Sequence, residues 1–221
     1  MSGRQRLRAL ARGQGSGGIA VPLALASAAR IQERDWQEFL EDPTQLANGL
    51  RDLHQAVGPD GLAVTAASVL VDQSRGGLGV GRHAVAAVEA VRRLRASLGD
   101  VVALVAPVPG PTALATNGTD AAKAAEEVQV FGKELLAAGV DVILVLDDGP
   151  AHSSLSTLDN MARFHQAVVA VLGEAQGRLV GAQRQSLHDP RSGDGLVVTD
   201  ADVPREADIT LLVDWVDAVQ S

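Results

Sequence analysis

Two adjacent aspartates, Asp147 and Asp148, directly follow the apolar run VDVILVL at residues 140–146. Neighbouring carboxylates can divide the roles of acid and base, or they can hold a cation together. His152 follows in the same loop and can shuttle protons near neutral pH or complete an Asp/Asp/His set for a divalent ion. The alternative is a solvated loop in which one aspartate caps the next helix. We assign Asp147, Asp148 and His152 as candidate catalytic residues and assign no metal site.

Arg184 and His188 follow another apolar run, RLVGAQ at residues 178–183. The planar guanidinium fork of an arginine matches the oxygens of a carboxylate or a phosphate. Arg184 is therefore a candidate to bind an anionic substrate, with His188 in the same loop. The alternative is an ion pair between Arg184 and an acidic loop, because acidic residues outnumber basic ones by 27 to 19.

A glycine-rich loop, DQSRGGLGVGRH, spans residues 72–83 and carries Arg75. Backbone N–H groups of such a loop can face an anion, and the start of the following helix adds a favourable dipole. The loop matches neither phosphate-loop signature, so a lid or a plain connection is the alternative. Arg75 is kept as a candidate substrate-binding residue.

Thr112 and Asn117 follow the segment VVALVAPVPG at residues 101–110. The stiff Gly110-Pro111 turn can hold both side chains where they donate hydrogen bonds. We interpret this turn as a scaffold first and as a binding feature second. The candidate substrate-binding residues are therefore Arg75, Thr112, Asn117, Arg184 and His188.

The elements that must position these side chains alternate between strand and helix. Near-continuous apolar strands of this kind indicate a parallel sheet buried on both faces, either a closed (β/α) barrel or an open doubly wound sheet. In both architectures ligands bind at the carboxyl ends of the strands, where the candidates lie. The predicted strands are 19–25, 61–67, 101–106, 140–146, 178–183 and 195–199. The predicted helices are 35–58 with a break at Pro43, 82–99, 120–139, 154–175 and 204–220 with Pro204 at its start.

Composition narrows the class of protein. A chain of 221 residues with 46% apolar residues can bury one core, and we expect a single domain over 19–221 after a flexible basic tail at 1–18. The run GQGSGG in that tail precedes a strand rather than following one, so it is not a dinucleotide fingerprint. A net charge of −8 argues against nucleic-acid binding.

Two absences narrow the class further. The chain has no cysteine, which excludes disulfides, thiolate zinc sites and cysteine nucleophiles. No apolar run is long enough to span a membrane, and the start has no apolar signal core, so we expect a cytoplasmic protein.

Several segments, in this order, resemble the uroporphyrinogen decarboxylase superfamily, which includes cobamide-dependent methyltransferases. The similarity begins at AVPLALASAARIQ (20–32) and continues through FLEDPTQLANGLRDLHQAVGPDGLAV (39–64). It is most specific at VVALVAPVPGPTALA (101–115), whose Gly-Pro-Thr turn followed by Ala-Leu-Ala is typical of the family. KELLAAGVDVILVLDD (133–148) and GLVVTDADVPREADITLLVDWVDAV (195–219) extend it along the chain. The resemblance implies an α/β fold, a (β/α) barrel of the TIM type.

The sequence also departs from this family. The interval between 178–183 and 195–199 is too short for the two further β/α units of a full barrel, so we expect a shortened or incomplete barrel, or one completed by a partner chain. No arginine-rich segment for substrate carboxylates follows Gly18. Ala67 or a neighbour stands where the decarboxylases carry their catalytic aspartate, and the cysteine ligands of the methyltransferase zinc are missing.

Three hypotheses about function follow. The first is a lyase of the decarboxylase type that acts on an anionic small molecule without a cofactor, with Arg184 or Arg75 holding the anion and Asp147 or Asp148 handling the proton. The second is a non-catalytic barrel that binds a partner, as a homodimer or with another chain. The third is methyl transfer from a cobamide carrier. Neither nucleic acid nor a membrane is expected as a partner.

Overall fold

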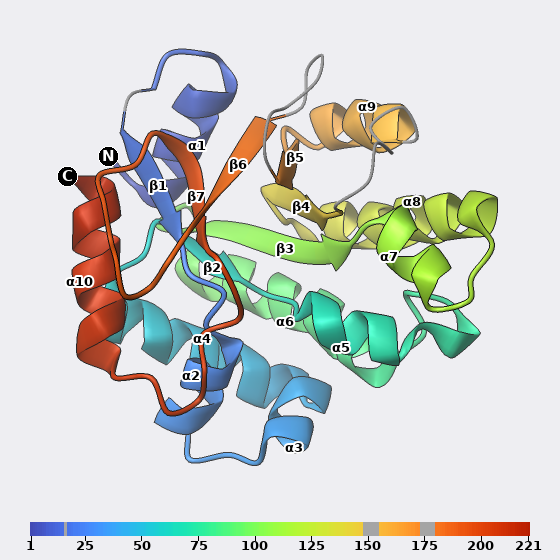
Figure 1. Ribbon diagram of the computed structural model, residues 1–221, viewed down its shortest axis with the longest axis horizontal. Coiled ribbons are helices and arrows are strands. Elements are labelled where there is room, and N and C mark those ends of the chain that lie inside the picture. The colour runs from blue at the N-terminus through green and yellow to red at the C-terminus, as the bar shows by residue number, and fades with distance from the viewer. Residues whose placement is uncertain (16, 148–154, 173–179) are drawn as a thin grey trace.

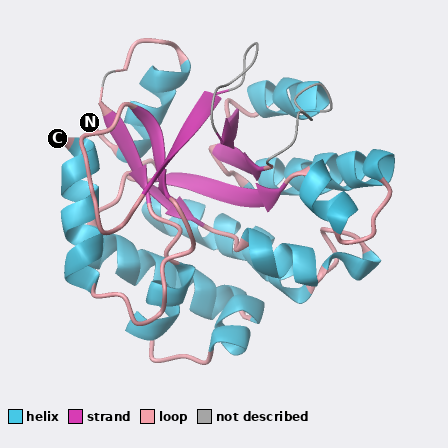
Figure 2. Cartoon of the chain, viewed as in Figure 1, coloured by secondary structure: helices cyan, strands magenta, loops and turns pink. Residues whose placement is uncertain are grey.

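The computed structural model describes residues 1–15, 17–147, 155–172 and 180–221 (Figure 1). Within these ranges seven parallel strands form one sheet in the order β1-β7-β6-β5-β4-β3-β2. Helices lie around the strands, which gather at the centre of the molecule (Figure 2). The strands are β1 (Gly18–Val21), β2 (Gly61–Ala63), β3 (Ala103–Pro109), β4 (Val142–Leu146), β5 (Val168–Leu172), β6 (Val180–Gln185) and β7 (Gly195–Thr199).

The two end strands of this sheet, β1 and β2, lie against each other and nearly close it into a barrel. The Ala20 N–H of β1 donates to Asp60 Oδ2, just before β2, at 3.1 Å. A Cβ on Gly61 would lie 2.8 Å from Val21 Cγ2, so only glycine allows the two strands this approach. The barrel expected from the sequence is confirmed, and one chain supplies all seven strands.

Alternating side chains of the strands form two separate apolar clusters. One fills the barrel interior with residues such as Val105, Leu144 and Leu196. The other joins the outward-facing residues to the surrounding helices. This is the pattern expected when parallel strands are buried on both faces.

The helices begin and end at the signals that the sequence carries. Asp42 ends one helix and caps the next, so the predicted helix at 35–58 is broken before Pro43, as expected. Gly139 ends the predicted helix at 120–139 with a φ of 107°. The helices are α1 (Gly3–Ala11), α2 (Leu25–Ile31), α3 (Trp36–Glu41), α4 (Pro43–Val57), α5 (Ala67–Asp72), the 3₁₀ turn η1 (Ser74–Gly76), α6 (Arg82–Leu98), α7 (Pro111–Thr116), α8 (Ala121–Ala138), α9 (Ser156–Phe164) and α10 (Ile209–Gln220). Among the described residues, no helix combines the length and apolar character needed to cross a bilayer.

The sequence predicted six strands, and the structure adds β5. The predicted helix at 154–175 is in fact α9 followed by this strand. The helix ends at Phe164, and Gln166 turns the chain with a φ of 56°. The following residues include Val168, Val169 and Val171, whose β-branched side chains favour a strand. The last helix was also placed too early, since α10 begins after its cap Asp208 rather than at Pro204.

The two prolines of β3 are tolerated because of the side of the strand on which they lie. Val64 N donates to Val105 O at 2.8 Å, so Pro107 and Pro109 face the β2 side as well. β2 ends at Ala63, and no β2 carbonyl is paired with their positions in the ladder. A missing N–H therefore costs no ladder hydrogen bond there.

The predicted flexible tail is wrong for residues 3–11, which form α1. Ser2 and Gln5 make a capping box at its start. Leu7 packs into the barrel interior and is 2% exposed. Arg6 Nη1 binds Asp60 Oδ1 at 2.8 Å, and Arg4 Nε binds Asp141 Oδ1 at 2.6 Å, so α1 covers the amino-terminal ends of the strands.

Candidate functional site

Asp147 lies at the carboxyl end of β4, on the mouth of the barrel, and is held against the turn after β3. The backbone N–H of Thr112 donates to Asp147 Oδ2 at 3.1 Å. A Cβ on Gly110 would lie 2.2 Å from Asp147 Cβ, so a glycine is required at the facing position. Asp148 and His152 lie outside the described residues.

Arg184 is a positively charged residue near the carboxyl end of β6. Alternate residues of a strand lie on the same face of the sheet. Val180 and Ala182 pack into the barrel interior, so Arg184 also lies on the inner face, at the mouth. Its side chain is exposed and makes no hydrogen bond or ion pair with the part of the chain that the structure describes. This leaves its fork open to an anionic ligand.

The other predicted binding residues have more local roles. Asn117 Nδ2 donates to Val71 O at 3.0 Å and so ties the end of α7 to α5. Thr112 contributes its backbone N–H to Asp147, as described above. His188 is exposed in the turn after β6, with its N–H bound to Ser186 Oγ at 3.3 Å.

The glycine-rich loop that carries Arg75 packs against α8 in an acidic setting. The N–H of Leu78 donates to Glu127 Oε2 at 3.1 Å. Glu126 and Glu134 line the same hollow between the loop and α8. Arg75 itself is exposed in η1. These carboxylates oppose the binding of an anion at this loop.

A carboxyl group that the sequence analysis did not single out, Asp202, lies in the loop after β7. Ser68 Oγ in the first turn of α5 donates to Asp202 Oδ2 at 3.3 Å. Asp202 also lines a small cavity of about 50 Å³ with Thr65, Ala66 and Trp36. The residue is exposed as a whole, but the protein that surrounds its carboxyl removes part of the solvation of the charged form and so raises the pKa of Asp202; the Ser68 hydrogen bond opposes that rise.

The position of Asp202 bears on the residue that the family resemblance found missing. Ala67 begins α5 at the end of β2, and Ser68 is the next residue. Asp202 therefore brings a carboxyl group from the loop after β7 to the end of β2. Asp202 follows the predicted strand at 195–199, much as Asp147 follows the one at 140–146. Its place after a strand end is therefore the sequence signal that identifies it.

The backbone at the end of β2 is fixed by His83. Its Nε2 accepts the N–H of Ala66 at 2.9 Å, and its Nδ1–H donates to Leu40 O at 3.1 Å. The Thr65 hydroxyl donates to Pro107 O beside it. Burial lowers the pKa of His83 to about 4, so the ring is neutral and serves to hold the loop that faces Asp202.

Among the described residues, the mouth thus brings Asp147 and Asp202 to different strand ends, together with the open cation of Arg184. Within the described residues, no three His, Cys, Asp or Glu side chains come together as metal ligands. The arrangement suits binding of an anion and transfer of a proton.

Comparison with known proteins adds information on the fold. No family model matches the chain, and no curated protein matches it. A solved structure of a methyltransferase from Methanosarcina mazei is similar, with a TM-score of 0.74 and 14% identity over 99% of this chain and 98% of that chain. A tryptophan synthase alpha chain from Legionella pneumophila subsp. pneumophila has a TM-score of 0.50 and 10% identity over 99% of this chain and 97% of that chain. At these identities the likeness shows the architecture, and the chain is a seven-stranded, nearly closed (β/α) barrel of the TIM type.

Proposed function

We propose that the chain is an enzyme of the lyase type that decarboxylates a small anionic molecule at the carboxyl-end mouth of the barrel. The observation that carries the proposal is the placement of Asp202, with a raised pKa, beside Ser68 and the cavity at the end of β2. The sequence resemblance to the uroporphyrinogen decarboxylase superfamily supports the same reaction class, and the solved structures support the fold on which it rests.

In this proposal Arg184 binds one carboxylate of the substrate, and the carboxylate to be lost lies near Asp202. The bond between that carboxylate and its carbon breaks, CO₂ leaves, and the electron pair stays on the carbon. The carboxyl of Asp202, whose protonated form the raised pKa favours, gives a proton to this carbon, and a proton from solvent restores it. Asp147 lines the opposite side of the mouth and positions the substrate through hydrogen bonds.

The test is CO₂ release from a panel of di- and tricarboxylic acids, after native mass spectrometry of the gently purified protein has been used to look for a retained ligand. Asp202→Asn and Arg184→Gln should each reduce turnover at least a hundredfold. Asp189→Asn, at an exposed residue, and Arg205→Gln, at a half-buried one, are controls that make the same charge changes outside the proposed site and should keep full activity. Full activity in both test variants would overturn the assignment.

Methyl transfer from a cobamide carrier is the second candidate, because one of the similar structures is a methyltransferase. The chain has no cysteine, so any acceptor would have to be activated in another way. Loss of the methylcobalamin absorbance in the presence of the protein and a thiol acceptor would favour this reaction over decarboxylation.

A further inference from the structure

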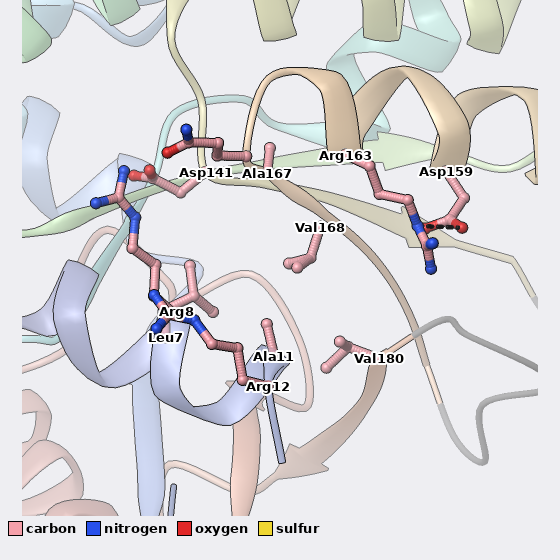
Figure 3. Close-up of a pocket in the computed structure, with 11 residues that line it drawn as sticks. Leu7, Arg8, Ala11, Arg12, Asp141, Asp159, Arg163, Ala167, Val168 and Val180 are labelled. Atoms are coloured by element: carbon pink, nitrogen blue, oxygen red, sulfur yellow. Dashed lines mark ion pairs between the residues drawn. The ribbon is translucent and has the colours of Figure 1, made fainter. Parts of the chain in front are cut away.

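A second cavity, of about 540 Å³, opens at the amino-terminal end of the barrel, opposite the mouth. Asp141 precedes β4, and Val168 and Val180 begin β5 and β6, so the cavity lies where these strands start. Figure 3 shows α1 on one side of it and the end of α9 on the other. Its volume is within the range of about 300–1,000 Å³ that small-molecule sites occupy.

The acidic residues of this cavity are already bound by arginines. Asp141, which is 4% exposed, accepts from both Arg4 and Arg95. Asp159 pairs with Arg163, Nε to Oδ2, at 3.1 Å, as the dashed line in Figure 3 marks. Neither carboxylate therefore remains to neutralise a further cation of the lining.

Arg8 and Arg12 supply that further positive charge. Neither forms an ion pair or a side-chain hydrogen bond within the described parts of the chain, and Arg8 Nε is enclosed without any hydrogen-bond partner. Arg8 lies in the last turn of α1, and Arg12, four residues later, is the C-cap of that helix, so their like charges lie at the same end of α1 and repel each other. An oxyanion between the two guanidinium forks would relieve this repulsion and satisfy the enclosed Nε.

Gln166 adds a polar side chain to the wall of the cavity. It follows α9 with a φ of 56°, a left-handed conformation that favours glycine. Gly58 and Gly139 have this conformation directly after α4 and α8, whereas Gln166 is the second residue after α9. Gln166 instead keeps a side chain there, and that side chain lines the cavity. Strain retained at a wall of a cavity is typical of functional positions.

The rest of the wall is aliphatic and is made of small side chains. The apolar lining residues are Leu7, Ala11, Ala167, Val168 and Val180. No aromatic ring lines the cavity among the described residues, so the wall suits a compact aliphatic body rather than a planar ring.

We propose that this cavity is a second binding site, for a small amphiphilic anion with an oxyanion head and an aliphatic body. Arg8 and Arg12 hold the head, Gln166 donates an amide hydrogen bond to it, and the aliphatic wall covers the body. The head is a carboxylate or a phosphate, since the guanidinium fork fits both.

Calorimetric titration of the full chain with octanoate, octyl phosphate and inorganic phosphate tests the proposal. At least one of the two amphiphiles should bind, at least tenfold tighter than inorganic phosphate, and the tighter of the two identifies the head. Arg8→Gln and Arg12→Gln should each weaken that binding at least tenfold. Arg51→Gln on α4 makes the same charge change outside the cavity and should leave it unchanged. Absence of binding by both amphiphiles, or binding that ignores the two arginines, would overturn the site.

Gln166→Gly separates a binding role from a structural one. Glycine relieves the left-handed strain, so the melting temperature should stay the same or rise while the amphiphile binds several-fold more weakly. A variant that binds the amphiphile as well as the original chain would show that Gln166 has no part in the site. Retained CO₂ release in all these variants would separate this site from the one at the mouth.

Discussion

The ring of His83, on α6, accepts the backbone N–H of Ala66 at the end of β2 at 2.9 Å, 17 residues apart in sequence. Its other nitrogen donates to Leu40 O, so the neutral ring satisfies one donor and one acceptor of the backbone. A buried histidine used in this way links the stability of the mouth to pH.

Acidification should destabilise the fold through His83. The unfolded chain binds a proton on this ring below its ordinary pKa of 6.5, whereas the folded chain does so only near 4. The free energy of unfolding therefore falls as pH drops through this window, by about 2 kcal/mol between pH 7.5 and 5.0. Urea unfolding at the two pH values measures it.

His83→Leu supplies the comparison for this pH effect. The variant leaves the Ala66 N–H and the Leu40 carbonyl unpaired, so it should lose about 2–4 kcal/mol at pH 7.5. It should lose less than the original chain on acidification, because the titrating ring is gone. Replacing the exposed His188 should not reduce the pH dependence. An unchanged pH dependence in His83→Leu would contradict the assignment.

Gly110→Ala should destabilise the fold by about 1–3 kcal/mol through overpacking. The backbone of Gly110 has a φ of −78°, which alanine accepts, so the cost comes from the clash with Asp147 alone. Asp147→Gly removes the clashing atoms, and the double variant should recover at least about 1 kcal/mol relative to the sum of the single changes. Chemical denaturation of the four proteins measures this coupling, and strict additivity would show that the two residues do not meet.

Asp60→Ala should cost about 3–5 kcal/mol, because it leaves the Arg6 cation without its carboxylate and removes the bond to Ala20 N–H that joins β1 to β2. Asp60→Asn keeps an oxygen for Ala20 and should cost less. Asp100→Ala, which removes an exposed partner of Arg4, should change stability little. Thermal unfolding ranks the three variants, and an equal loss for Asp60→Ala and Asp100→Ala would refute the closure role.

Asp202→Asn should not lower stability at neutral pH, although we expect it to reduce turnover at least a hundredfold. A raised pKa means that the folded state disfavours the charged carboxylate, so folding gains from protonation as pH falls and loses as pH rises through that pKa. An amide carries no such cost. Melting temperatures at pH 7 should therefore be equal or higher in the variant, as is common for residues kept for function rather than stability. A clear drop would assign Asp202 a structural role.

The sequence alone predicted those strands and helix ends whose signals lie within a few residues of one another. Apolar runs ended by glycine, proline or aspartate predicted the strands around 142–146 and 195–199, and Pro43 and Gly139 predicted a helix break and a helix end. Such patterns depend on neighbours a few residues away, because strand alternation, caps and turns are properties of short segments. A parallel sheet, with the carboxyl ends of its strands as the place of the site, follows from these elements, whereas the choice of a barrel over an open sheet came from the family resemblance.

Contacts between distant segments were decided by the tertiary structure. Ser68 and Asp202 are 134 residues apart, and they meet because barrel closure brings the end of β7 beside β1 and β2. From the sequence alone, the arginines of α1 indicated a basic tail. In the fold Arg4 pairs with Asp141 and Arg6 pairs with Asp60. The sequence of β5 was predicted as the end of a helix. It is a strand in the fold because β4 and β6 form hydrogen bonds along its two edges. Periodicity cannot report which distant groups become partners, because that depends on how the whole barrel closes.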